Sequence, residues 1–241
     1  MKISSYSILA EYTPTLIITI FIVILLDFHD IDVSKILENI DKVSIETDML
    51  NLSGIFVIYF LFSFLIRYSG KHFFEKRHFN NGLDFPTTHY LLSTNTIKSP
   101  AYKKRIFNLL KIENNFDYDE FILENDIDNE KKIISEQIGY IRTRVNKDGE
   151  QTLTMLTRYG FFRNLIGGLI ILFPLFIFEI ILILFATFID KTMIISSVEF
   201  FIFLTSFIGV ILVLFRKRII NNFATEYANK LLDEFTTLST K

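Results

Sequence analysis

The feature that decides the fold is the stretch of residues 161–189, with the sequence FFRNLIGGLIILFPLFIFEIILILFATFI. Arg163 and Glu179 are its only charged residues. A helix crosses the ~30 Å hydrocarbon core of a bilayer with about 20 such residues. Because this stretch is longer and contains Pro174, we predict a membrane-spanning helix that is tilted or kinked.

Further apolar stretches flank this one in a chain of 241 residues, of which 50% are hydrophobic. We predict four transmembrane helices, within residues 1–28, 52–70, 159–189 and 198–215. The first is the weakest, because its apolar core from Tyr12 to Leu26 is short unless Ile8 to Glu11 extend it. No small-residue cleavage site follows it, so we interpret it as a retained anchor. The sequence therefore predicts an all-α integral membrane protein.

The distribution of Lys and Arg predicts the orientation of these helices, because basic residues are retained on the cytoplasmic side. The segment Asp27–Asn51 has two lysines against seven acidic residues, whereas the segment Lys71–Arg158 has fourteen basic residues. Residues 190–197 carry a single lysine, and residues 216–241 carry five basic residues. We expect both termini and the inserted domain in the cytoplasm, with the acidic loop 29–51 and the turn 190–197 outside.

The predicted cytoplasmic domain, residues 71–158, lacks the alternation of apolar and polar residues that marks half-buried strands, so we expect it to be mainly helical. Residues 80–82, Asn-Asn-Gly, suit a left-handed cap. Ser99 and Pro100 form a cap and first-turn pair that predicts a helix from Ala101 to Ile112.

Two further patterns predict helices in this domain. Pro86 can start a short helix, with the hydroxyl groups of Thr87 and Thr88 available to cap it. Apolar residues then recur at helical spacing and should form a buried face: Ile134, Ile138, Ile141 and Val145.

The tail, residues 216–241, is predicted to form a C-terminal amphipathic helix. Its apolar positions alternate in steps of four and three residues and are interrupted at Glu234. This spacing is compatible with a short coiled-coil seam between copies, or with packing onto the cytoplasmic domain of the same chain.

Glu179 lies near the centre of the third predicted span, where an ionised carboxylate is costly. One hypothesis is that Glu179 is a pore-lining or proton-sensitive group. Pro174 loosens the helix backbone about one turn before it. The alternative is a neutral helix-packing residue, hydrogen-bonded to Tyr59 or Ser63 of the second span.

Two sets of basic residues are candidates for binding anions. Arg216, Lys217 and Arg218 follow the fourth predicted span and suit lipid phosphates. Arg105, Arg142 and Arg144 lie farther from the spans and are candidates for an anionic messenger. The alternative is that these three arginines bind no ligand and only reflect the general excess of positive charge on the cytoplasmic side. The net charge of −2 gives no general support to nucleic-acid binding.

Several chemistries have no support in the sequence. There is no cysteine, so thiol catalysis and thiolate metal sites are excluded. His72, His78 and His89 lack the spacing of a metal site, and we expect no metal or cofactor. No phosphate loop, nucleophile elbow or kinase signature is present, so we expect no catalytic residues and no enzyme.

Three segments carry a resemblance to a family of poorly characterised bacterial inner-membrane proteins with four spans. They are GLDFPTTHYLL at residues 82–92, KKR at 103–105 and RYGFFRNLIG at 158–167. The family pattern is GG-x-PTT-x-LL after the second span and YGF-x-RN-x-x-G at the third. Here Gly82-Leu83-Asp84 departs from the glycine pair of that pattern. The resemblance implies an inner-membrane location and a membrane effector of antiviral defence.

Arg163 and Asn164 lie where the third span meets the interface, and we interpret them as a structural hinge that bonds phosphate or carbonyl groups. The leading functional hypothesis is an oligomeric membrane effector whose cytoplasmic domain senses a soluble protein or an anionic messenger. The alternative is a non-conducting scaffold or sensor that recruits a soluble partner. A lipid-processing enzyme or a transporter has less support.

Overall fold

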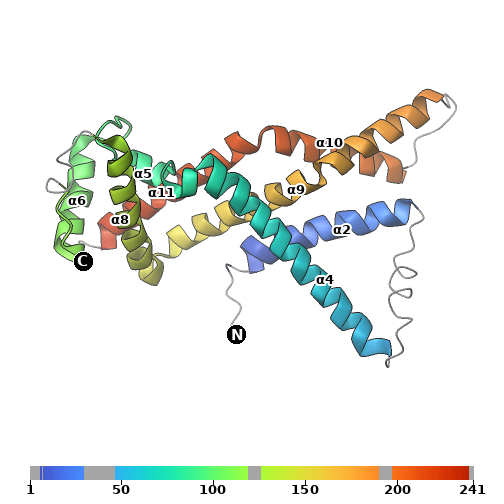
Figure 1. The fold of residues 1–241 in the computed structure, drawn as a ribbon, viewed down its shortest axis with the longest axis horizontal. Coiled ribbons are helices and arrows are strands. Elements are labelled where there is room, and N and C mark those ends of the chain that lie inside the picture. Colours follow the sequence, from blue (N-terminus) through green and yellow to red (C-terminus); the bar gives the residue numbers. More distant parts are fainter. Residues whose placement is uncertain (1–5, 7, 30–46, 119–125, 190–196, 239–241) are drawn as a thin grey trace. The chain divides into compact units, whose positions relative to one another are not determined.

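The computed structural model describes residues 6, 8–29, 47–118, 126–189 and 197–238. All regular elements in these ranges are helices, which confirms the all-α part of the predicted fold class (Figure 1). Most of the acidic loop 29–51 and of the turn 190–197 lies outside the described residues. The chain divides into two units, described separately below: residues 1–71 with 161–216, and residues 72–160 with 217–241.

The helices follow one another in chain order, with some labels falling on segments that are not described. They are η1 (Ile8–Tyr12), α2 (Thr13–Phe28), α4 (Thr47–Gly70), η2 (Lys71–His78), η3 (Asn80–Gly82), α5 (Pro86–Leu91), α6 (Pro100–Asn114), α8 (Ile127–Asp148), α9 (Glu150–Ile189), α10 (Ser197–Leu214) and α11 (Arg216–Leu238).

In the first unit, α2 and α4 run antiparallel. The Thr15 hydroxyl donates to Ser63 Oγ at 3.3 Å, and Arg67 Nη1 donates to Glu11 Oε2 at 2.9 Å. Residue numbers therefore rise along α2 as they fall along α4. The π-helix η1 precedes α2, so the residues predicted to lengthen the first span are helical.

The second half of α9 runs parallel to α2 and antiparallel to α10. Asn164 contacts Ala10, and 15 residues later Glu179 contacts His29 at the other end of α2. On the opposite side, Gly209 of α10 lies against the Phe176 ring. The first unit is thus a bundle of four helices whose directions alternate.

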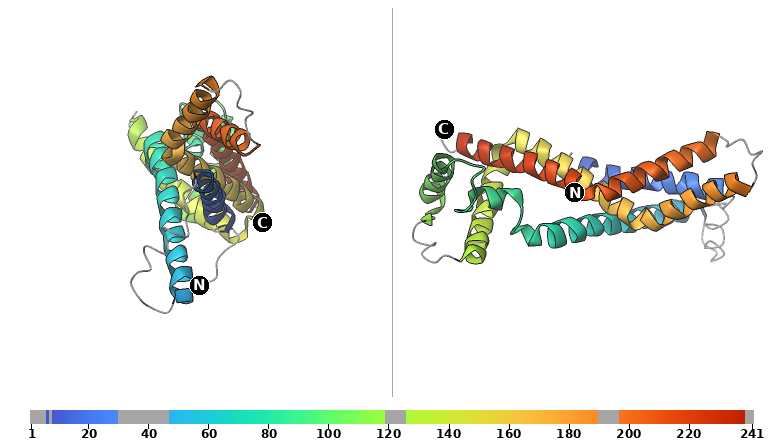
Figure 2. Two further views of the ribbon diagram at one scale, coloured as in Figure 1. Left: turned by 90° about the vertical axis from the view of Figure 1, so that its right-hand side faces the viewer. Right: turned by 90° about the horizontal axis from the view of Figure 1, so that it is seen from above.

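The four helices run alongside one another (Figure 2), and apolar side chains from all four pack together in one cluster. Ile18 of α2, Ile66 of α4 and Phe176 of α9 are each no more than 2% exposed, and Val213 of α10 packs with them. Ile18 and Phe176 also line an apolar cavity of about 410 Å³ between α2, α9 and α10.

Among the described residues, two helices are long and apolar enough to cross a membrane, Ile8–Leu26 and Glu150–Phe185. A third qualifies if Val198–Leu214 and Arg216–Leu238 are counted together across the break between them. Large apolar side chains on their outer faces are exposed, as lipid-facing residues are, including Phe178 and Phe185. Helices of this kind indicate a membrane protein. α9 is continuous through Pro174, and the predicted kink stays a prediction.

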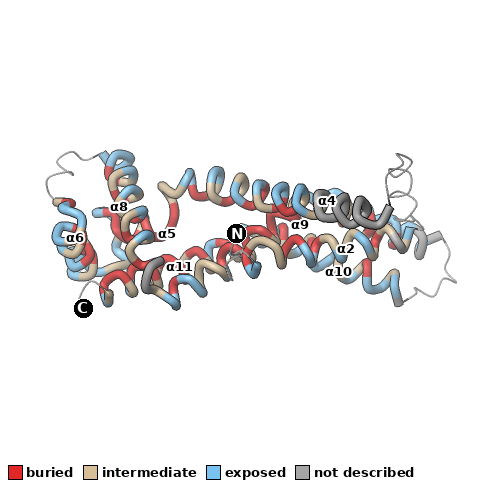
Figure 3. The backbone as a smooth tube through the Cα atoms, turned by 90° about the horizontal axis from the view of Figure 1, so that it is seen from below, coloured by how far each residue is buried: buried red, intermediate tan, exposed pale blue. Residues whose placement is uncertain are grey.

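The second unit is a helical domain in which α8 and α11 each bury one face and expose the other (Figure 3). The predicted apolar face of α8 is confirmed, because Ile134, Ile138, Ile141 and Val145 are at most 2% exposed. The tail helix α11 belongs to this unit, so it packs on its own chain rather than standing free.

Local signals in the sequence placed several helix ends correctly. Ser99 accepts a hydrogen bond from the Tyr102 N–H at the start of α6. Asn80, Asn81 and Gly82 have positive φ angles of 46°, 56° and 94°, as a left-handed cap requires.

One local expectation was wrong. The Thr88 hydroxyl does not cap α5 but donates to the Gly82 carbonyl at 3.1 Å, and Phe85, the N-cap residue, has no side-chain cap. A second finding adds to the sequence analysis without contradicting it: the Glu234 carboxylate accepts hydrogen bonds from the N–H groups of Gln151 and Thr152 and so caps α9.

Candidate functional site

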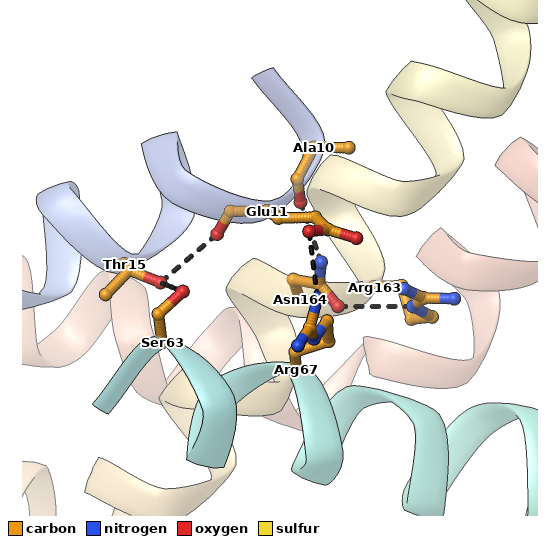
Figure 4. A network of polar contacts seen from close by, with 7 residues as sticks. All are labelled: Ala10, Glu11, Thr15, Ser63, Arg67, Arg163 and Asn164. Atoms are coloured by element: carbon orange, nitrogen blue, oxygen red, sulfur yellow. Dashed lines mark hydrogen bonds and ion pairs between the residues drawn. The ribbon is translucent and has the colours of Figure 1, made fainter. Parts of the chain in front are cut away.

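A buried hydrogen bond joins η1, which precedes α2, to α9 (Figure 4). Pro14 has no backbone N–H, so the carbonyl of Ala10, four residues earlier, lacks its usual helical donor. The side-chain amide of Asn164 donates to this carbonyl at 2.7 Å. Ala10 and Asn164 are both fully buried. Asn164 therefore satisfies a backbone group that the proline leaves unpaired.

Arg163 extends this contact along α9. Its Nε donates to the Oδ1 of Asn164 at 3.2 Å, and the residue is only 5% exposed. The guanidinium thereby fixes the orientation of the Asn164 amide, with the oxygen toward Arg163 and the NH₂ group toward Ala10. The residues predicted as a hinge thus contact one another and form a carbonyl hydrogen bond within the first unit.

Three further polar contacts surround this bond. Glu11 and Arg67 form an ion pair at 2.9 Å, with the Glu11 side chain 19% exposed and the Arg67 side chain 39% exposed. The Thr15 hydroxyl, fully buried, contacts both Ser63 Oγ and the Glu11 carbonyl. These contacts and the Asn164 bond together form what we call the junction network, which connects α2, α4 and α9 (Figure 4).

Two glycines let the backbones of α4 and α9 approach one another beside the junction network. A Cβ atom on Gly167 would lie 2.5 Å from the backbone N of Gly70, and one on Gly70 would lie 2.8 Å from the Arg163 carbonyl oxygen. The Ser69 hydroxyl donates to the Gly167 carbonyl across the same crossing at 2.8 Å. Small residues at a helix crossing of this kind are typical of membrane bundles.

The intramembrane carboxylate is paired, though not with the expected residue. Glu179 is 1% exposed, and its Oε1 lies 2.9 Å from Nε2 of His29. The Tyr59 and Ser63 partners were wrong, because Tyr59 donates to the Tyr12 carbonyl and Ser63 pairs with Thr15. The second oxygen, Oε2, is buried without a partner among the described residues.

The three arginines proposed for an anionic messenger have separate partners in the second unit. Arg142 places its guanidinium over the Phe85 and Tyr227 rings, 5.6 and 6.0 Å from their centroids. Arg144 pairs with Glu113 at 3.6 Å, and Arg105 donates to the Thr236 carbonyl at 3.4 Å. Arg142 and Arg144 are two residues apart on α8 and so point to different sides of it. Nothing in these contacts brings the three together as one site.

The basic residues after the fourth predicted span begin α11. Arg216 is half-buried and donates to the Val213 carbonyl at 2.9 Å, and Lys217 and Arg218 are exposed. Among the described residues, no group of three His, Cys, Asp or Glu side chains could hold a metal ion.

Sequence reasoning missed several members of these contacts. Pro14 carried a usable signal, because a proline inside a helix frees a carbonyl four residues earlier. Glu11 and Arg67 also stood out as opposite charges at the ends of two apolar stretches. His29 offered no such signal, since its partner lies 150 residues away in the chain.

No protein-family model, curated protein or solved structure matches this chain at a significant level.

Proposed function

We propose that this chain is a four-span protein of the bacterial inner membrane that works as an oligomeric effector. In this proposal its cytoplasmic domain receives a signal, and the helices of the first unit rearrange and open or disrupt the membrane. Both termini and residues 71–158 are cytoplasmic, and antiviral defence is the proposed setting.

The junction network is the observation that carries this proposal. A membrane anchor has no need of buried polar side chains, because each one must find a partner or raise the free energy of the folded state. A connected set of polar contacts instead specifies one helix arrangement, and its bonds are lost together when the helices shift. This behaviour suits an element with two states.

The position of the network along the chain supports a link to the cytoplasmic domain. The first unit ends at residue 71 and resumes at residue 161. Gly70 and Arg163 lie within a few residues of these two boundaries. The helix continues through each boundary, as α4 followed by η2 and as α9, so a displacement in the domain has helical connections through which to act.

The small number of helices supports an oligomer. Four helices packed around Ile18, Ile66 and Phe176 are too few to enclose a wide channel within one copy. Conduction therefore requires several copies, or a large separation of helices. The exposed apolar faces of α9 and α10 can contact either lipid or other copies.

Membrane potential is the direct test. The chain is expressed in a bacterial host, alone and with its genomic neighbours, and a voltage-sensitive dye is followed before and after phage challenge. We expect depolarisation upon the trigger. Asn164→Leu removes contacts that hold the resting arrangement, so this variant should depolarise cells without the trigger.

Asn222→Leu, an exposed substitution on α11, serves as the matched control and should behave as wild type. Absence of depolarisation under every trigger, with the protein present in the membrane, rules out the effector. A variant Asn164→Leu as silent as the control rules out the role of the junction network.

The scaffold is the second candidate, and one observation favours it. Ile97 and Ile112 of the cytoplasmic domain are 72% and 77% exposed, which suits contact with a soluble protein. A genomic neighbour that co-purifies with wild type but not with Ile97→Asp/Ile112→Asp, together with unchanged membrane potential, would favour the scaffold.

A further inference from the structure

The second unit contains a cavity of about 570 Å³ beside α6. Its volume lies within the range of small-molecule sites. Polar and basic residues from the loop before α6, from α6 itself and from the segment after it line the cavity. The lining residues used below are Ser93, Lys98, Lys104, Phe107, Lys111 and Tyr118.

The charge of this lining favours an anion. Four lysines and one aspartate line the cavity, which leaves an excess of three positive charges. Lys111 and Asp117 form an ion pair with one another, and Lys98 lies over the rings of Tyr90 and Tyr102. Lys104 lines the cavity and is exposed.

The fourth lysine, Lys103, shapes the cavity wall. It is 8% exposed, and its ammonium group donates to the carbonyls of Leu92 and Asn95. Burial lowers the pKa of Lys103 below its ordinary value. Lys103 therefore holds the loop before α6 in place, and Lys104 is an exposed lysine of the lining.

Glu130 holds together two segments that line the cavity, one with Ser93 and one with Tyr118. It is 3% exposed and accepts hydrogen bonds from the Ser93 N–H at 2.6 Å, the Ser93 hydroxyl at 2.9 Å and the Tyr118 hydroxyl at 2.7 Å. A buried carboxylate with three donors makes the surrounding geometry rigid. Hydrogen bonds of Glu130 and Lys103 thus fix the positions of the segments that line the cavity.

An aromatic pair provides a flat wall. The rings of Phe107 and Tyr118 stack with centroids 3.9 Å apart and planes 19° apart. Both residues line the cavity and are half-buried. Aromatic side chains beside lysines are the groups that bind a base and its phosphates.

We infer that this cavity binds a small organic phosphate that carries an aromatic ring, the chemical class of nucleotides. The lysines contact the phosphate, and the Phe107–Tyr118 wall contacts the ring. The site supplies a ligand class for the signal of the proposed effector. Only this consequence rests on the proposed function, since binding can be measured without any change in the membrane.

Titration of the full-length protein in detergent with trinitrophenyl-ATP, whose fluorescence rises on burial, tests the inference. We expect the probe to bind saturably and ATP to displace it better than adenosine or tripolyphosphate does. Adenosine lacks the phosphates, and tripolyphosphate lacks the aromatic ring. Lys104→Glu should weaken binding by about tenfold or more, as expected for a lost charged contact. Lys132→Glu, an exposed lysine on α8 outside the cavity, should leave binding unchanged.

Three outcomes would overturn the inference. One is no saturable binding of the probe up to millimolar concentration, and another is equal weakening by Lys104→Glu and Lys132→Glu. The third is displacement by tripolyphosphate as effectively as by ATP, which indicates general polyanion capture. If the probe binds but the membrane potential does not change, the binding site is supported and only the proposed effector function is contradicted.

Discussion

Pro14 and Asn164 show, at the scale of single residues, how a side chain of one helix replaces a backbone donor that is missing in another. Pro14 is buried in α2 and cannot donate to the Ala10 carbonyl. In an apolar surrounding an unpaired carbonyl is costly, and Asn164 supplies the missing donor. Arg163 holds the amide in the required orientation.

Asn164→Leu should destabilise the protein by about 1–3 kcal/mol, the cost of a buried carbonyl without a donor. In a Pro14→Ala background the same substitution should cost less, because the restored N–H can donate to Ala10 instead. Thermal unfolding of the four proteins in detergent measures this difference. Equal costs in the two backgrounds would show that the Asn164 bond does not compensate for the proline.

Asp84 and Lys131 give a residue-scale prediction about pH. The hydrogen bond from Lys131, 2.6 Å from Asp84 Oδ1, lowers the pKa of Asp84 below its ordinary value of 3.8. A carboxylate whose folded pKa is lowered stabilises the fold above its unfolded pKa, and this contribution is lost as the pH falls through the folded pKa.

Wild type should therefore be more stable than Lys131→Met at pH 7, by about 0.2–1 kcal/mol for a partly exposed pair. The difference should shrink as the pH falls below 3.8. Melting temperatures across this range, with Lys132→Met as the control, provide the measurement. A difference that persists unchanged at pH 3 contradicts the role of the ion pair.

Glu179 shows what the sequence can and cannot predict for a single residue. The cost of a carboxylate within an apolar helix predicts that it is buried with a polar partner, and the structure agrees. The partner itself depends on helix register, which brings His29 rather than Tyr59 or Ser63 to it. Register follows from packing along whole helices, and local spacing does not encode it.

At the scale of elements, the crossing of α4 and α9 depends on the absence of side chains. Gly167 and Gly70 approach so closely that a methyl group on either meets backbone atoms of the other helix. Backbone cannot move aside as a flexible side chain can. Helix α8 offers a contrast, because a Cβ on Gly139 would meet nothing within 4 Å.

The same substitution should therefore have opposite effects in the two helices. Gly139→Ala should stabilise the protein by about 0.5–1 kcal/mol through helix propensity. Gly167→Ala should destabilise it by about 1–3 kcal/mol or more, because the methyl group forces the helices apart. Thermal unfolding of both variants compares them. Stabilisation by Gly167→Ala would refute the close crossing.

Elements with local signals were predicted well, and elements that depend on distant contacts were not. The start of α6 follows from Ser99 and Pro100, whose chemistry acts within one turn. The cap on α9 comes from Glu234, more than 80 residues away. The π-helical form of η2, Lys71–His78, likewise had no signal in the residues that form it.

At the scale of the whole molecule, the alternation of helix directions fits the topology predicted from charge. α2 and α9 run parallel, and α4 and α10 run opposite to them, as in a chain that crosses a membrane four times. The contacts of Glu11, Arg67 and Asn164 join the three helices toward one end of the first unit. The Lys and Arg distribution predicts that this end faces the cytoplasm, and that orientation stays a prediction.

The central claim is that four spans separate an acidic loop and a short turn from a cytoplasmic domain and tail. Cysteine labelling tests it directly, because the chain contains no cysteine of its own. Single substitutions place one thiol in each segment: Ser34→Cys, Thr94→Cys, Ser196→Cys and Ser239→Cys. A membrane-impermeant maleimide should label Ser34→Cys and Ser196→Cys in intact spheroplasts, and Thr94→Cys and Ser239→Cys only after permeabilisation. Labelling of all four in intact spheroplasts, or protection of Ser34→Cys with exposure of Thr94→Cys, would contradict the claim.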